Sequence, residues 1–135
     1  MIVIADTGAL YTLVDASDAW HKRVVAWWKQ NRDPVTIPVC VLPEVSYLLH
    51  TRISPDAERA FIRSIVDGEI AVEPLEEADI ARAEVLMRKY DDLGFVDTTI
   101  VATAERLDAV EILTTDRRHF SKIRPAHVGT FTLSP

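Results

Sequence analysis

The sequence has little cysteine, little glycine and no long apolar run. Its single cysteine, Cys40, cannot form an internal disulfide, and we interpret it as a small buried apolar residue. Only 4 glycines and a hydrophobic content of 48% argue against a low-complexity or disordered chain. The apolar runs are far shorter than the ~20 residues that cross a bilayer, and the chain does not begin with a signal-peptide pattern. We therefore expect a single cytoplasmic domain over residues 1–135, without a membrane segment.

Charge is unevenly distributed along the chain. The net charge of −6 argues against a generally basic nucleic-acid-binding surface. The segment through Asp116 carries −10, whereas the remainder carries +4 and contains no Asp or Glu. This basic tail is either an ordinary solvated edge or a strip that holds phosphate groups. The second interpretation makes Arg117, Arg118 and Lys122 candidate phosphate contacts.

Strand-like and helix-like patterns alternate along the chain. Short apolar segments at 1–5, 34–38, 69–74, 110–115 and 129–133 are typical of strands. Helical patterns predict helices over 8–14, 19–30, 41–51, 55–66, 75–90 and 95–107, and a short turn at 118–121. We expect Ser17 or Asp18 to cap the second helix, and Pro43 to lie in the first turn of the third. The alternation predicts an α/β fold with a central, mainly parallel sheet of four to five strands flanked by helices.

Four acidic residues occupy positions that solvation alone does not explain. Asp6 and Asp116 each follow directly on a predicted strand, and parallel α/β sheets bind ligands at the carboxyl ends of their strands. Either residue could instead be a helix N-cap. Glu44 shares a helix face with apolar residues, which predicts a carboxylate at the edge of a buried stripe. Asp97 also shares a face with core positions, although capping of its own helix is an alternative.

Gathering these carboxylates would be unfavourable without a cation. Two of them at about 4 Å repel by roughly 4 kcal/mol at an effective dielectric constant near 20. Either the four lie far apart or a metal joins them. Ligation by oxygen alone selects hard ions such as Mg²⁺ or Mn²⁺, which serve phosphate chemistry by activating water and neutralising charge. Asp116 would then be a metal ligand, and the basic residues after it would hold a phosphate backbone.

Four ordered segments resemble the PIN-domain nucleases, and among them the VapC toxins of toxin–antitoxin pairs. They are IADTGAL (4–10), VLPEVSYLL (41–49), LGFVDTTIVATAERL (93–107) and ILTTDRRHF (112–120). The resemblance implies a three-layer α/β/α fold and metal-dependent endoribonuclease activity. It implies that Asp6, Glu44, Asp97 and Asp116 are the catalytic, metal-binding quartet. It also implies an RNA substrate, a VapB-type antitoxin partner and a homodimer.

Three further positions bear on this resemblance. Thr115 matches a hydroxyl residue often found beside the last acid, where it could orient a metal-bound water or the last carboxylate. Gly8 stands where many relatives have Ser, so a contact behind the metal ligands is missing. Asp92 lies in the turn DDLG, where Asp is ordinary, and we leave it outside the site.

The quartet leads to a mechanistic hypothesis. We expect Asp6 and Asp97 to bind one Mg²⁺ directly, with Glu44 and Asp116 acting through water or holding a second ion. Attack on phosphorus by the activated water would leave 5′-phosphate and 3′-hydroxyl ends, because the ribose 2′-hydroxyl is not needed. No histidine pairs as a general acid in the sequence, so water should protonate the leaving oxygen. His119 is the only exception we consider.

The tryptophan pair of the second helix has two interpretations. Trp20, Val24 and Trp27 recur on one helical face, which indicates core packing. Trp28 falls beside this stripe, and two adjacent rings are hard to bury from one helix. Trp28 is therefore either a further core residue or part of an apolar groove for an antitoxin helix.

Other Mg²⁺-binding α/β proteins match less well. A receiver domain would have adjacent acids after its first strand, whereas Asp6 lies between Ala5 and Thr7. A phosphatase with an aspartate nucleophile would have a second Asp where this chain has Gly8. A catalytically silent PIN-fold module that binds RNA or a protein partner is the remaining alternative.

Overall fold

Five parallel strands form the centre of the molecule. The computed structural model describes residues 1–135, and its strands follow the order β3-β2-β1-β4-β5. All neighbouring strands pair in parallel, as the alternation of the sequence predicted. The strands are β1 (Val3–Ala5), β2 (Val35–Pro38), β3 (Ile70–Glu73), β4 (Glu111–Leu113) and β5 (Thr132–Ser134).

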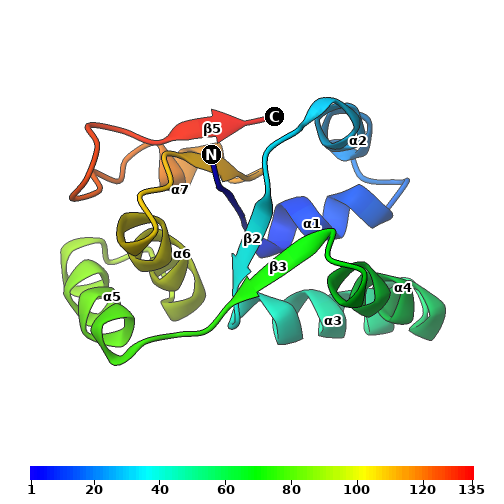
Figure 1. Ribbon diagram of the computed structural model, residues 1–135, viewed down its shortest axis with the longest axis horizontal. Helices are drawn as coiled ribbons and strands as arrows, with labels where there is room; N and C mark the ends of the chain where they lie inside the picture. Colours follow the sequence, from blue (N-terminus) through cyan, green and yellow to red (C-terminus); the bar gives the residue numbers. More distant parts are fainter.

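Helices cover both faces of this sheet (Figure 1). Helices α5 and α6 lie on one side, while α1, α3 and α4 lie on the other. The α/β fold with a flanked parallel sheet is thereby confirmed. No helix is long and apolar enough to span a membrane. The helices are α1 (Thr7–Val14), α2 (His21–Gln30), α3 (Val41–Arg52), α4 (Pro55–Val66), α5 (Glu77–Lys89), α6 (Phe95–Arg106) and α7 (Arg117–Phe120).

Helix α6 is the most deeply buried helix. Its residues from Thr98 to Ala104 are all buried, because small alanine and threonine side chains allow close packing. The hydroxyls of Thr98 and Thr99 donate to backbone carbonyls of the preceding turn at 2.7 and 2.6 Å. These internal hydrogen bonds satisfy polar groups that burial would otherwise leave unpaired. The helix therefore holds its first turn, which contains Asp97, in a fixed place.

A salt-bridge cluster fixes the far end of α6. The Arg106 guanidinium lies 2.7 Å from Glu73 and 3.0 Å from Asp79, which is buried at the start of α5. Asp79 also accepts from the Glu76 N–H at 3.0 Å and so closes a capping box on α5. Helices α5 and α6 and the end of β3 are thus tied together.

The sheet register brings two strand ends to the same edge. Ala5 of β1 is paired with Leu113 of β4, so Asp6 and Thr114 leave neighbouring strands side by side. The Asp6 N–H donates to the Leu113 carbonyl at 3.0 Å, which fixes this exit.

Local details differ from the expectations. Helix α2 begins at His21 with Trp20 as an N-cap that makes no side-chain hydrogen bond, while Asp18 accepts from the Trp20 N–H at 2.8 Å instead. Pro43 lies in the first turn of α3, as expected. The prediction of a buried Cys40 was wrong, because this residue precedes α3 and is partly exposed. The last strand is displaced toward the C-terminus relative to 129–133.

Candidate active site

Asp6 is a buried carboxylate at the start of α1. Its side chain is only 5% exposed, accepts from the Ala9 N–H at 2.8 Å, and accepts a second hydrogen bond from the Thr114 hydroxyl. Burial, with smaller contributions from the charges of Asp97 and Asp116, raises the pKa of Asp6 to about 6 in spite of these two donors. Asp6 is therefore both an N-cap and a member of an acidic cluster.

Asp116 combines the same two roles at the start of α7. One carboxylate oxygen accepts from the His119 N–H at 3.1 Å, and the other lies 2.6 Å from His119 Nδ1. The Asp116 N–H donates to the Thr114 hydroxyl oxygen at 2.8 Å. Since that hydroxyl also donates to Asp6, a single threonine connects the two acids.

Asp97 does not cap its helix. The N-cap of α6 is Gly94, and the Asp97 carboxylate makes no hydrogen bond within the protein, so the capping alternative was wrong. Burial raises the pKa of Asp97 above its ordinary value, and the charges of Asp116 and Glu44 raise it further, while His119 lowers it. Asp97 is thus close enough to both acids to experience their charge.

Glu44 lies in the first turn of α3 and is exposed. Position 44 flanks the face of α3 that buries Val41, Val45 and Leu49, but its carboxylate is open to solvent and not partly buried. No cation pairs with Glu44, yet its charge raises the pKa of Asp97. The structure therefore brings Glu44 to the same cluster, at its solvent side.

The four carboxylates share uncompensated negative charge. No Lys or Arg forms a salt bridge with any of them, and only His119 pairs with Asp116. No three acidic, histidine or cysteine side chains converge closely enough to form a closed metal-ligand set. The buried Thr7 hydroxyl, directly after Asp6, has no hydrogen-bond partner. An all-oxygen donor set with excess negative charge fits a hard divalent cation.

The hydroxyl that contacts the acids belongs to Thr114. The sequence resemblance pointed to the next residue, Thr115, whose hydroxyl makes no hydrogen bond within the protein. Instead, Thr115 Oγ1 fills the space beside Gly8, where an added Cβ would lie 3.1 Å from it. The sequence TTD alone does not distinguish the two threonines, whereas the pairing of Ala5 with Leu113 selects Thr114.

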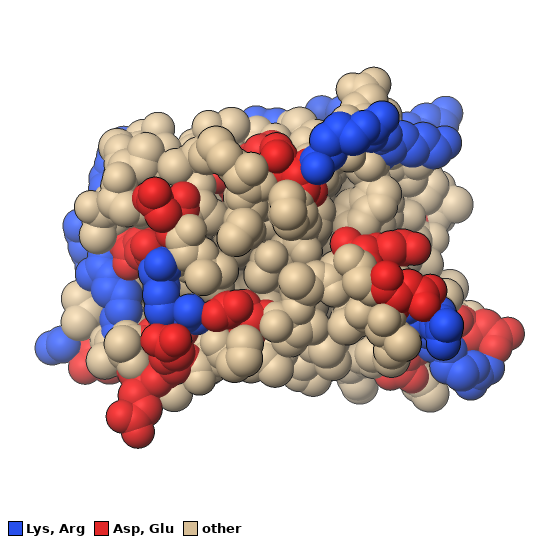
Figure 2. Space-filling model, in the orientation of Figure 1, with Lys and Arg blue, Asp and Glu red and all other residues tan.

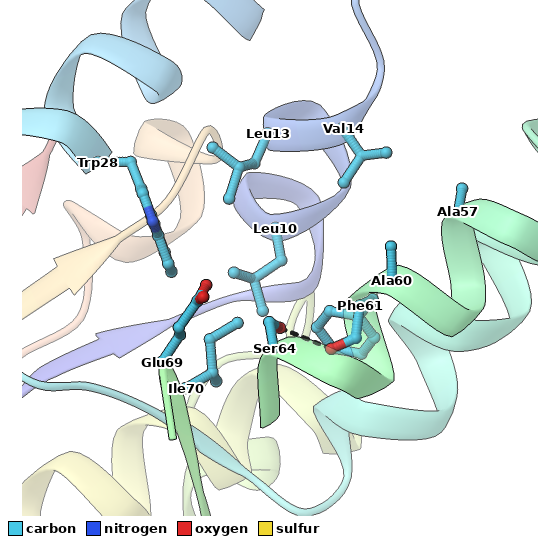
Figure 3. Close-up of a pocket in the computed structure, with 10 residues that line it drawn as sticks. All are labelled: Leu10, Leu13, Val14, Trp28, Ala57, Ala60, Phe61, Ser64, Glu69 and Ile70. Carbon is cyan, nitrogen blue, oxygen red and sulfur yellow. Dashed lines mark hydrogen bonds between the residues drawn. The ribbon is translucent and has the colours of Figure 1, made fainter. Parts of the chain in front are cut away.

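A second surface feature is an apolar groove between α1, α2, α4 and β3 (Figure 3). Its volume is about 160 Å³. Trp28 and Glu69 face each other on one side of it, and Val14, Ala57 and Ala60 lie toward the other end (Figure 3). Trp27 and Trp28 both pack partly against the core, so the second aromatic ring contributes to core and groove together. The groove is lined by Leu10, Leu13, Val14, Trp28, Ala57, Ala60, Phe61, Ser64, Glu69 and Ile70.

Comparison with known proteins places the chain in a family. A model of the PIN domain matches residues 3–124. The chain belongs to the PIN-domain family. Within it the chain is a VapC-type ribonuclease toxin: ribonuclease VapC26 of Mycobacterium tuberculosis is 36% identical over 135 residues, covering 98% of this chain and 100% of the relative.

Solved structures share the fold. VapC20 of Mycobacterium tuberculosis, a toxin that cleaves the sarcin–ricin loop, superposes with a TM-score of 0.76 at 23% identity, covering 82% of this chain and 86% of that one. A toxin–antitoxin complex from Klebsiella pneumoniae gives a TM-score of 0.69 at 18% identity, covering 90% and 92%. These similarities establish the PIN fold, which the sequence resemblance predicted.

Asp92, which the sequence gave no reason to include in the site, lies against the histidine that contacts Asp116. It lies in the turn between α5 and α6, and its Oδ2 is 3.3 Å from both His119 Nε2 and Lys122 Nζ. An acid in a turn is ordinary, so composition gave no reason to select it. The only signal was its place directly before the family segment 93–107, five residues ahead of Asp97.

The basic residues of the tail have different surroundings. Arg118 is exposed and its guanidinium has no partner, whereas Arg117 donates to the Pro135 carbonyl and Lys122 pairs with Asp92. Basic side chains are not confined to the tail. Figure 2 shows a group of them at the upper right, over α2, where Lys22, Arg23 and Lys29 are exposed.

Proposed function

We propose that this VapC-type toxin hydrolyses RNA at a divalent-cation site formed by Asp6, Glu44, Asp97 and Asp116. The observation that supports the proposal is the gathering of uncompensated carboxylates from four elements of the fold. Burial is the main cause of the raised pKa of Asp6 and Asp97, the charges of neighbouring acids add to it, and a bound cation would remove this repulsion. When bound, Mg²⁺ or Mn²⁺ supplies an activated water and neutralises charge on the phosphate.

The four carboxylates differ in their surroundings, and we expect different roles for them in binding the ion. Asp6 is held by Thr114 and the Ala9 N–H, so its orientation is set before an ion arrives. Asp6 and Asp97 would hold the ion directly, because both are at least partly withdrawn from solvent. Glu44 is exposed and the Asp116 carboxylate already contacts the His119 ring, so these two would act through water or on a second ion when RNA is present. Hydrolysis of this kind leaves 5′-phosphate and 3′-hydroxyl ends, and a 2′,3′-cyclic phosphate product would exclude it.

Cleavage of an end-labelled structured RNA tests the proposal. The reaction is run with Mg²⁺, with EDTA, and with an Asp97→Asn variant whose folding is checked by circular dichroism. Asp91→Asn is the matched control, because Asp91 is an exposed acid with no hydrogen bond or salt bridge from its side chain. We expect cutting that requires both the metal and Asp97. A folded protein that binds RNA without cutting it in Mg²⁺ or Mn²⁺ would support the silent module instead.

Arg117 and Arg118 are proposed to contact the RNA backbone. Each phosphate contact contributes about 0.7 to the slope of log affinity against log salt for a single strand. Removing both arginines should therefore reduce this slope by roughly 1.4. The control removes Arg59 and Arg63, which are equally exposed on α4. An unchanged slope in the Arg117/Arg118 variant would mean that these side chains point away from the RNA.

We further propose that a helix of a VapB-type antitoxin occupies the apolar groove. An amphipathic helix buries its apolar face in such a groove, and a toxin–antitoxin complex is among the proteins that share this fold. Trp28 would be the main aromatic contact, as the second interpretation of the tryptophan pair held. The two partners would meet in the cytoplasm. The expected homodimer rests on the family resemblance alone, and sedimentation velocity tests it.

Ala60 provides a test of the groove. It is an exposed α4 residue that lines the groove, so Ala60→Arg introduces bulk and charge there while remaining compatible with a helix. Ile62→Arg is the control, since Ile62 is exposed on the same helix outside the groove. We expect Ala60→Arg to lose binding of the cognate VapB-type antitoxin and to keep nuclease activity. Equal antitoxin binding by both variants would place the partner elsewhere.

A further inference from the structure

His119 joins the turn before α6 to the start of α7. Its Nδ1 lies 2.6 Å from Asp116 Oδ2, and its Nε2 lies 3.3 Å from Asp92 Oδ2. The Lys122 ammonium lies 3.3 Å from the same Asp92 oxygen. The result is a continuous polar chain from Asp116 through His119 and Asp92 to Lys122.

Asp116 needs such support more than Asp6 does. Asp6 is almost completely buried and accepts from two donors on different elements, whereas the Asp116 side chain is 38% exposed. Asp116 starts a helix of only 4 residues, and its second oxygen has no protein contact except the His119 ring. Without the imidazole, one backbone N–H would be the only group that orients the carboxylate.

The imidazole itself is held from both sides. The backbone of His119 donates to Asp116 Oδ1, so its main chain and its ring contact the same carboxylate. On the opposite side Asp92 limits rotation of the ring, and Lys122 holds Asp92 in place. Both ring nitrogens thereby face carboxylates, and neither is free to protonate a leaving oxygen. This arrangement argues against the general-acid role considered for His119.

We infer that His119 and Asp92 are positioning residues that orient the Asp116 carboxylate toward Asp6 and Asp97. Outer hydrogen bonds of this kind fix the orientation of metal-binding carboxylates, and their loss typically weakens metal binding by 10- to 100-fold. The inference rests on the proposed metal site. It assigns a role to Asp92, which the sequence presents only as a turn residue, and it makes the turn before α6 part of the site.

The inference is tested by the binding of Mn²⁺ alone. Titration calorimetry measures this binding, and so does the decrease of the electron paramagnetic resonance signal of the free ion. We expect His119→Ala to weaken Mn²⁺ binding by about 10- to 100-fold. His119→Asn should retain most of the affinity, because its amide nitrogen can donate from nearly the same place as Nδ1. Asp92→Asn should give a smaller loss, and it should add nothing in the His119→Ala background, because Asp92 acts through the ring.

The controls separate positioning from folding. His50→Ala removes another histidine–carboxylate pair, that with Glu58 at 2.9 Å on α3 and α4, and should leave Mn²⁺ affinity unchanged. If His119→Ala does not fold, the exposed Asp92→Asn variant decides the question by itself. If His119→Ala folds and binds Mn²⁺ with wild-type affinity, this inference is overturned and the proposed metal site stands. If His119→Ala does not fold, wild-type affinity in Asp92→Asn has the same meaning. Failure of the wild-type protein to bind Mn²⁺ would overturn both.

Discussion

The hydroxyl of Thr114 donates a hydrogen bond to the buried carboxylate of Asp6. Its oxygen also accepts from the Asp116 N–H at 2.8 Å, so Thr114 lies between two acids of the proposed site. Because strands β1 and β4 are adjacent, this contact joins residues that are 108 positions apart in the chain. The pairing of strands is therefore what assembles this part of the site.

Thr114→Val should reduce both stability and activity. Valine keeps the shape of threonine but leaves the Asp6 oxygen and the Asp116 N–H without their partner, which costs about 1–3 kcal/mol. Urea unfolding measures this loss. Thr114→Ser keeps the hydroxyl and should cost less, and Thr115→Val should have a much smaller effect. A loss from Thr115→Val as large as that from Thr114→Val would contradict the assignment of the bridging hydroxyl.

Asp6→Asn should stabilise the metal-free protein at neutral pH. Burial raises the pKa of Asp6 from 3.8 to about 6, and this rise amounts to ~3 kcal/mol of destabilisation at neutral pH. Between pH 3.8 and about pH 6, the folded protein binds a proton at Asp6 that the unfolded chain does not bind. The free energy of unfolding should therefore increase as the pH falls from about 7 to 4, as far as this group is concerned.

Asparagine retains the helix cap, because its amide oxygen can still accept from the Ala9 N–H. Urea unfolding in EDTA across this pH range should show a pH-dependent gain in wild type that Asp6→Asn lacks. Mg²⁺ should stabilise the wild-type protein and not the variant, since a ligand stabilises only the state that binds it. If Asp6→Asn were less stable than wild type at pH 7 in EDTA, the carboxylate would not be a source of destabilisation.

Arg106→Met should destabilise the fold without disturbing metal binding. The variant leaves the buried Asp79 without its cation, which costs on the order of 3 kcal/mol. Arg82→Met is the comparison, because it breaks the more exposed pair with Glu105 and should cost no more than about 1 kcal/mol. Thermal and urea unfolding measure both, and Mn²⁺ affinity below the transition should equal that of wild type. If the two variants lost the same free energy of unfolding, the burial of Asp79 would not add to the cost of removing its cation.

The sequence predicted the sheet better than it predicted the surroundings of the candidate acids. Alternating patterns gave the parallel sheet, since strand and helix periods are local properties of the chain. The family segments selected Asp6, Glu44, Asp97 and Asp116, and in the structure the charges of other members of this set contribute to the raised pKa of Asp6 and of Asp97. These charge effects support their proposed role, which the experiments above test.

Relations between distant segments were not predictable in the same way. The exposure of Glu44 depends on what covers α3, and helical periodicity alone placed it too near the core. The choice between Thr114 and Thr115 depends on strand register, which no local pattern contains. The contact of Asp92 with His119 joins the turn before α6 to helix α7, and no local sequence pattern predicts a contact between such distant segments.

The crowding between Gly8 and Thr115 gives the last prediction. Gly8 lies in α1, where alanine is ordinarily favoured over glycine by up to about 1 kcal/mol. The added Cβ would lie 3.1 Å from Thr115 Oγ1, which is closer than ordinary contact, so the gain should be reduced or reversed. In a Thr115→Ala background the obstacle is absent and the full gain should appear. Urea unfolding of the four proteins gives the coupling energy, and additive effects would show that Thr115 moves aside freely. Coupling would explain how this chain accommodates glycine at a position where the sequence resemblance leads us to expect serine, because the Thr115 hydroxyl occupies the space that a side chain at position 8 would need.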